Sequence, residues 1–133
     1  MIKAAFPDYA KRTLTLAETV RTCVARYVTG VQQVMQAVKV PTWVLGPMPN
    51  PPGDIQGVYG SVGSSVERAA ACAVFHGELQ DCAARVGFKV VSARDALVND
   101  HGECKPEYMM DVVHLNQKGQ AHVLATCATA GLL

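Results

Sequence analysis

The first long stretch of patterned hydrophobicity begins after Thr15, which precedes Glu18 by three residues in a capping-box signature. Apolar residues then recur at alternating spacings of four and three, the period of one face of an α-helix. These residues are Val20, Val24, Tyr27, Val31, Val34 and Val38. Because Pro41 cannot continue a helix, the pattern predicts a long helix that ends near Lys39.

A second helix is predicted between two short strands. Residues 42–45 (Thr-Trp-Val-Leu) and 88–92 (Phe-Lys-Val-Val-Ser) are rich in strand-forming side chains. Between them, Ser64 and Glu67 repeat the capping-box spacing, and Gly87 supplies a helix stop. The apolar positions of this helix are Cys72, Phe75, Leu79, Cys82 and Val86.

The remaining segments favour loops and one last helix. Residues 46–53 contain four prolines, which predicts a stiff connection, and residues 54–63 are irregular and Gly-rich. A polar loop is expected over residues 94–111. Asn116 can cap a final helix over residues 117–130.

Helices alternate with strands along the chain, which predicts an α/β fold with a parallel sheet. Only two strands are visible in the sequence, whereas a parallel pair usually has helices on both faces and neighbouring strands at its edges. We therefore expect residues 1–133 to form a single, incomplete domain. A partner chain or a missing N-terminal segment would complete the sheet.

The charge balance and apolar content exclude several classes of protein. The chain has 12 Lys and Arg against 11 Asp and Glu, so its net charge of +1 gives no electrostatic support for nucleic-acid binding. A hydrophobic share of 50% supports a packed core rather than a disordered tail. No apolar run is long enough for a transmembrane segment, and the N-terminus lacks the apolar core of a signal peptide.

Cysteine usage favours a reducing intracellular compartment. The 5 cysteines are an odd number without Cys-x-x-Cys spacing: Cys23, Cys72, Cys82, Cys104 and Cys127. The first three fall in helical patterns, so we expect free thiols rather than a zinc or redox site. His101 and Cys104 have metal-capable side chains, but no second pair follows, and a polar turn is the favoured interpretation. No metal or cofactor is expected.

The stretch with the clearest chemical meaning contains Asp111 and His114, just before the last predicted helix. A carboxylate three residues before an imidazole on a loop can reach it, set its tautomer and leave the other ring nitrogen as a general base. The alternative from the spacing alone is a capped helix with a surface His and Asp.

Residues 111–119 read Asp-x-x-His-Leu-Asn-x-x-Gly and come shortly after Pro-Glu-Tyr at 106–108. This block resembles the last block of the SGNH/GDSL hydrolases, which are serine esterases, lipases and thioesterases with a flavodoxin-like three-layer fold. Gly-Pro-x-Pro at 46–49 and Arg-Asp-Ala-Leu at 94–97 occur in the order of that family's second half. The resemblance covers essentially the whole chain and implies that Asp111 and His114 are the triad Asp and His.

The chain lacks the family's Gly-Asp-Ser nucleophile block and the blocks that supply the other oxyanion-hole donors. Residues 2–6 (Ile-Lys-Ala-Ala-Phe) are similar to the segment directly after the family's Gly-x-Asn-Asp block, so we expect the chain to begin just after that block. Ser61 is an alternative nucleophile. However, Tyr59 occupies the first Gly position of a nucleophile elbow, and a loop residue is the favoured interpretation.

These residues support two functional hypotheses. The first is the C-terminal part of an SGNH-type hydrolase of small or lipid-like esters or thioesters, with the nucleophile supplied from elsewhere. The alternative is a non-catalytic structural or interaction subunit derived from that fold and working within a larger assembly. The missing nucleophile and oxyanion donors indicate that the isolated chain is inactive.

Overall fold

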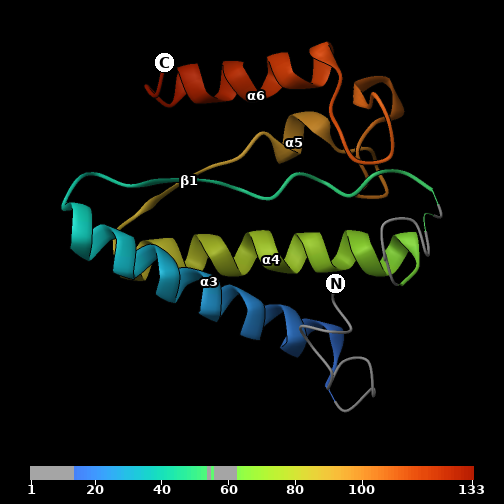
Figure 1. The fold of residues 1–133 in the computed structure, drawn as a ribbon. Helices are drawn as coiled ribbons and strands as arrows, with labels where there is room; N and C mark the ends of the chain where they lie inside the picture. Colours follow the sequence, from blue (N-terminus) through green and yellow to red (C-terminus); the bar gives the residue numbers. More distant parts are fainter. Residues whose placement is uncertain (1–13, 54, 56–62) are drawn as a thin grey trace.

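Two parallel strands lie between helices in the computed structural model, which describes residues 14–53, 55 and 63–133 (Figure 1). The elements in chain order are α3 (Leu16–Val38), β1 (Trp43–Leu45), α4 (Ser65–Val86), β2 (Lys89–Val91), α5 (Arg94–Leu97), the 3-10 turn η2 (Pro106–Tyr108) and α6 (Gln117–Thr129). In the sheet, Val44 lies opposite Val90. The predicted mixed α/β architecture with parallel strands is therefore confirmed.

The predicted helix starts are confirmed in atomic detail. The Thr15 hydroxyl accepts a hydrogen bond from the Glu18 backbone N–H at 3.2 Å, and the Glu18 carboxylate accepts one from the Thr15 N–H at 2.8 Å. Ser64 and Glu67 form the same reciprocal pair at the start of α4. Gly87 ends α4 with φ 96°, a left-handed conformation that glycine adopts without strain.

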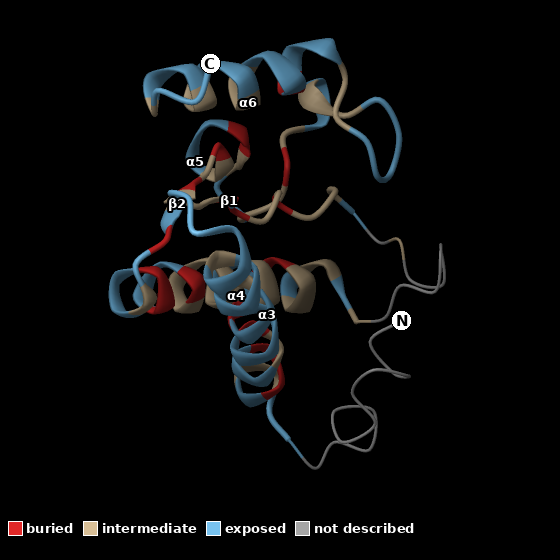
Figure 2. Ribbon diagram, turned by 60° about the vertical axis from the view of Figure 1, so that its left-hand side comes forward, coloured by how far each residue is buried: buried red, intermediate tan, exposed pale blue. Residues whose placement is uncertain are grey.

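The helices cover the two faces of the strand pair. Figure 2 shows the strands between α6 on one side and both α3 and α4 on the other. The larger core joins α3, α4 and the strands through Val20, Val24, Val28, Val44, Leu79, Cys82, Ala83 and Phe88. A second core of Ala93, Leu97 and Cys104 packs against Met48, Tyr108, Met109, Leu115 and Val123, and so links α5, η2 and α6.

The apolar stripe of α3 is buried only in part. Its buried valines are Val20, Val24 and Val28, whereas Tyr27 and Val34, which the periodicity places on the buried face, are 45% and 55% exposed. Val38, from the same stripe, is also 51% exposed, so the helix is as predicted but its apolar face is not covered at these three positions. Tyr27 and Val34 line a groove beside β1, and the Tyr27 ring also lies 6.2 Å from the Phe75 ring of α4, measured between centroids.

The expected polar loop over residues 94–111 is more ordered than its sequence suggests. It contains α5, η2 and an isolated antiparallel bridge between Val98 and Cys104. Leu97 and Cys104 are fully buried, so two apolar side chains in an otherwise polar stretch hold this segment in place.

All 5 cysteines are free thiols, and Cys127 also lies in a helix, α6. None of the helices in the described part of the chain combines the length and apolar content needed to cross a membrane. Two sets of residues with specific predictions, residues 2–6 and Ser61, lie outside the described residues.

Candidate functional site

Asp111 and His114 lie on a closed loop between η2 and α6, here called the dyad loop (residues 109–115). An antiparallel bridge between Met109 and Leu115 closes its base. Within the loop, the Met110 N–H donates to the His114 carbonyl at 2.9 Å. Both strands run toward the end of the molecule where this loop lies (Figure 1).

Asn116 connects the dyad loop to the start of α6. Its side-chain oxygen accepts hydrogen bonds from the backbone N–H groups of Lys118 and Gly119 at 3.0 and 3.1 Å, which is the predicted N-cap. Its side-chain nitrogen donates to the carbonyls of Glu107 and Met109 at 2.8 and 3.3 Å. One side chain therefore caps the helix and holds the loop base against η2.

Within the loop, the Asp111 carboxylate uses both oxygens. Oδ1 accepts from the backbone N–H groups of Val113 and His114, each at 2.7 Å. Oδ2 lies 2.8 Å from Nδ1 of the His114 ring. The structure thus brings together the two residues that the sequence singles out. The two backbone hydrogen bonds hold the Asp111 carboxylate in the orientation in which it contacts the His114 imidazole.

The electrostatics of the pair arise from these bonds. The hydrogen bond from the His114 side chain, followed by the backbone N–H bonds of His114 and Val113, lowers the pKa of Asp111 to about 2. Asp111 is therefore ionised at neutral pH and accepts a hydrogen bond from Nδ1–H of His114. That tautomer leaves Nε2 of His114 with a free lone pair, the arrangement that a general base needs. The His114 and Asp111 side chains are 67% and 46% exposed, so the pair is open to solvent.

The Asp111 carboxyl is expected to titrate near pH 2, and His114→Ala should move its midpoint toward the ordinary value of 3.8. Because the folded-state pKa is depressed, the pair stabilises the fold above pH 3.8, and this contribution is lost as the pH falls through about 2. Carboxyl NMR of the parent and of His101→Ala, an exposed His in another loop, provides the comparison. Equal midpoints in all three proteins would contradict the contact.

Among the described residues, no hydrogen bond joins a serine to the pair. Ser64 caps α4, Ser65 donates a hydrogen bond to Glu103, and the Ser92 hydroxyl accepts from the Arg94 backbone N–H at 3.2 Å. Of the two other metal-capable candidates, Cys104 is buried in the second core and His101 is exposed. In the part of the chain that the structure describes, no three His, Cys, Asp or Glu side chains form a metal-binding group.

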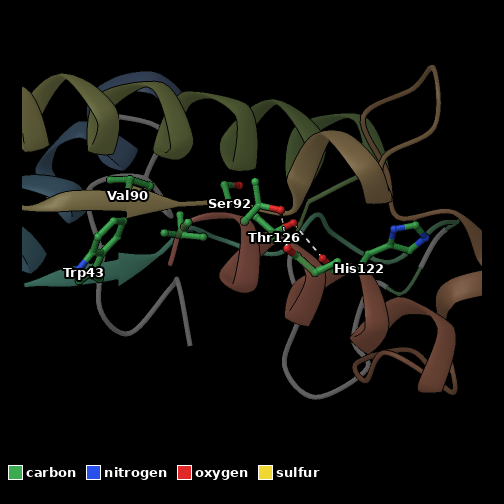
Figure 3. Close-up of a pocket in the computed structure, with 9 residues that line it drawn as sticks. Trp43, Val90, Ser92, His122 and Thr126 are labelled. Atoms are coloured by element: carbon green, nitrogen blue, oxygen red, sulfur yellow. Dashed lines mark hydrogen bonds between the residues drawn. The ribbon is translucent and has the colours of Figure 1, made fainter. Parts of the chain in front are cut away.

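A groove of about 450 Å³ lies between the strands and α6 (Figure 3). The residues that line this groove include Trp43, Val90, Ser92, His122 and Thr126, which are labelled in Figure 3. His122 is partly buried, as expected for a helical His, and packs edge-on against Tyr108 with ring centroids 4.8 Å apart. From the sequence, Ser92 was the one groove residue that could be expected to line a cleft. The available signal was its position directly after the second strand.

Comparison of the chain with protein-family models, with curated proteins and with solved structures gives no significant match. The hydrolase resemblance therefore stays a hypothesis that rests on the residues of the chain itself.

Proposed function

We propose that this chain supplies the acid–base pair of an ester hydrolase that uses a serine nucleophile. The observation that carries the proposal is the 2.8 Å contact between Asp111 and His114 on a braced loop. In this role, His114 Nε2 removes the proton from a serine hydroxyl as its oxygen attacks the acyl carbon, and returns the proton to the leaving alcohol or thiol. Asp111 stays ionised and stabilises the imidazolium.

The nucleophile and the oxyanion donors would come from outside the described residues, either from this polypeptide or from another chain. The resemblance to SGNH hydrolases favours small or lipid-like esters or thioesters as substrates. We also propose that further strands, from outside the described residues, extend the two-stranded sheet into a flavodoxin-like one.

The test uses the native assembly, isolated through an affinity tag on this chain. We expect it to hydrolyse p-nitrophenyl esters, and His114→Ala to lower kcat about a thousandfold or more, because the general base is lost. Asp111→Asn should also lower kcat, whereas His101→Ala should not. The purified chain alone should show no His114-dependent hydrolysis. Ester hydrolysis by the assembly that is insensitive to His114→Ala would refute the catalytic role.

The open edge of β1 favours a second candidate, a role as an interaction subunit. The bonds from the Lys89 N–H to the Thr42 carbonyl and from the Gly46 N–H to the Val91 carbonyl orient residues 42, 44 and 46 toward β2. The backbone groups of Trp43 and Leu45 therefore point away from β2, where the described residues contain no further strand.

The surroundings of this edge suit an added strand. A groove of about 640 Å³ lies between β1 and α3, lined by apolar residues that include Tyr27, Val31 and Val34. Leu45 itself is 51% exposed. An unpaired edge next to an apolar surface usually acquires a partner strand, including one from a second copy when no other is available.

We therefore expect light scattering to show self-association of the purified chain. Leu45→Pro should reduce the apparent mass, because it deletes only an N–H that points away from β2, and proline is tolerated on edge strands. Val66→Ser, at a 78% exposed site on α4, is the control and should leave the mass unchanged. A parent chain that is monomeric at every concentration, with cooperative unfolding, would count against this candidate.

A further inference from the structure

The open edge of β1 is bounded by prolines on both sides. The backbone groups of Trp43 and Leu45 point away from β2, because residues 42, 44 and 46 point toward it. The next residues at the same spacing are Pro41 and Pro47, and proline has no backbone N–H. The edge therefore presents two N–H donors, on Trp43 and Leu45, and a pairing strand finds no further donor directly beyond this window.

This window is symmetric about Val44. If two copies pair in antiparallel register with Val44 opposite Val44, then Trp43 of each copy lies opposite Leu45 of the other. These two residues form a hydrogen-bonded pair that exchanges both N–H···O bonds, so both N–H groups of the window gain an acceptor. Pro41 of one copy then lies opposite Pro47 of the other, and the ladder ends at the same point on both strands. The edge is thus complementary to a second copy of itself, as a two-fold interface requires.

The side chains of β1 suit the same register. Leu45 is 51% exposed, and the Trp43 ring of the second copy would lie directly opposite it on the same face of the sheet. Residues 40–47 contain no charged side chain, whereas strand edges that stay free usually carry charges that repel a partner strand. The composition of β1 therefore favours a paired edge over a free one.

Helix α3 adds apolar surface beside this edge. It lies on the other face of the strands from α6 (Figure 2), where Tyr27 and Val34 line the groove next to β1 and are 45% and 55% exposed. Because residues opposite each other in a ladder point to the same face, the two-fold axis stands perpendicular to the sheet. The second copy therefore brings its own α3 to this face, so that apolar burial adds to the backbone hydrogen bonds.

The outer edge of β2 is less suited to pairing. Lys89 and Val91 direct their backbone groups toward β1, so only Val90 of the three strand residues faces outward. Lys89 is also exposed, and an exposed lysine is a common protection of an edge strand. We therefore expect pairing at β1 alone, which gives a closed dimer rather than a longer chain of copies.

We propose that two copies of this chain pair through β1 in antiparallel register, with Val44 at the two-fold axis, and form a sheet in the order β2-β1-β1-β2. This inference rests on the second candidate function, the interaction subunit, and names its partner. Because the two copies of β1 run in opposite directions, the two dyad loops lie at opposite ends of the joined sheet. The dimer also competes with any further strand that would extend the sheet at β1.

The test is disulfide cross-linking of Val44→Cys in the full chain. In this register the two positions 44 form a non-hydrogen-bonded pair with Cα atoms about 4.5 Å apart, within the range that a disulfide bridges. We expect mild oxidation to give a covalent dimer, with the bridge at position 44 identified by mass spectrometry. The parent chain, with its 5 free cysteines, is oxidised in parallel.

Leu45→Cys is the matched control. The two positions 45 are offset by two residues along the strands in addition to the strand spacing, which together exceed the roughly 7 Å limit for a disulfide. This variant should therefore not cross-link, although its thiol is more exposed. Cross-linking of Leu45→Cys as readily as Val44→Cys would overturn the register.

Two measurements do not depend on an introduced cysteine. Leu45→Pro should raise the dimer Kd about tenfold or more in light scattering, because each copy loses one hydrogen bond to the other. In a parent sample mixed from labelled and unlabelled chains, NMR should show a contact between the Val44 Hα atoms of the two copies. This contact decides the register if Val44→Cys fails to fold.

The outcomes separate this inference from the candidate function on which it rests. A parent chain that stays monomeric at every concentration contradicts both. Association that Leu45→Pro weakens, without a cross-link or an NMR contact at position 44, leaves the interaction edge in place and overturns the antiparallel dimer.

Discussion

Leu97→Ala is expected to destabilise the fold by about 2 to 5 kcal/mol, the range for removing a fully buried leucine side chain. Leu97 is 0% exposed and sits at the centre of the second core. Chemical denaturation followed by circular dichroism measures the effect. Leu124→Ala, on the 58% exposed surface of α6, removes the same atoms and should change the free energy of unfolding little. Equal losses in the two variants would contradict the assigned core.

The same substitution should loosen the dyad loop before the whole chain unfolds. Leu97 belongs to the core against which Met109 and Leu115, the two residues that close the loop, are packed. We expect faster hydrogen exchange at the Met110 amide, which bonds to the His114 carbonyl at 2.9 Å. An unchanged Met110 amide in a destabilised Leu97→Ala variant would show that the loop is held independently of this core.

Gly119→Ala is expected to cost about 1 to 3 kcal/mol, although alanine is the better helix former. A Cβ at this position would stand 2.7 Å from the Tyr108 carbonyl oxygen and 3.1 Å from the Leu115 side chain. Because the nearest atom belongs to the backbone, relief requires η2 to move away from α6. That movement would also strain the bonds from Asn116 that hold the dyad loop.

Gly77→Ala is the matched control for Gly119→Ala. Gly77 is also helical, but a Cβ there meets nothing within 4 Å. Alanine at position 77 should therefore stabilise the protein by about 0.4 to 1 kcal/mol, the opposite sign. Thermal or chemical unfolding of the two variants measures the change in the free energy of unfolding and shows whether it has opposite signs. Stabilisation by Gly119→Ala would mean that the helix start does not pack closely on η2.

The Asp-x-x-His block shows how far a local pattern carries. Residues three apart on a short loop can meet without help from the rest of the chain, so the contact between Asp111 and His114 was predictable. Asn116 was predictable as an N-cap for the same reason. The requirement for glycine at position 119 was not, because it arises from η2, a separate element on the other side of the dyad loop.

The sequence by itself determined the three long helices, the two strands and their order, because capping boxes, apolar periods and prolines act over a few residues. Only the tertiary structure decided which side chains are covered. Val28 is buried whereas Tyr27 and Val34 are exposed, because the burial of a residue on α3 depends on which other element packs against its face of the helix. The approach of Ser92, which follows β2, to Gly46, which follows β1, has the same origin, because parallel pairing brings the ends of two strands together across a long stretch of intervening chain.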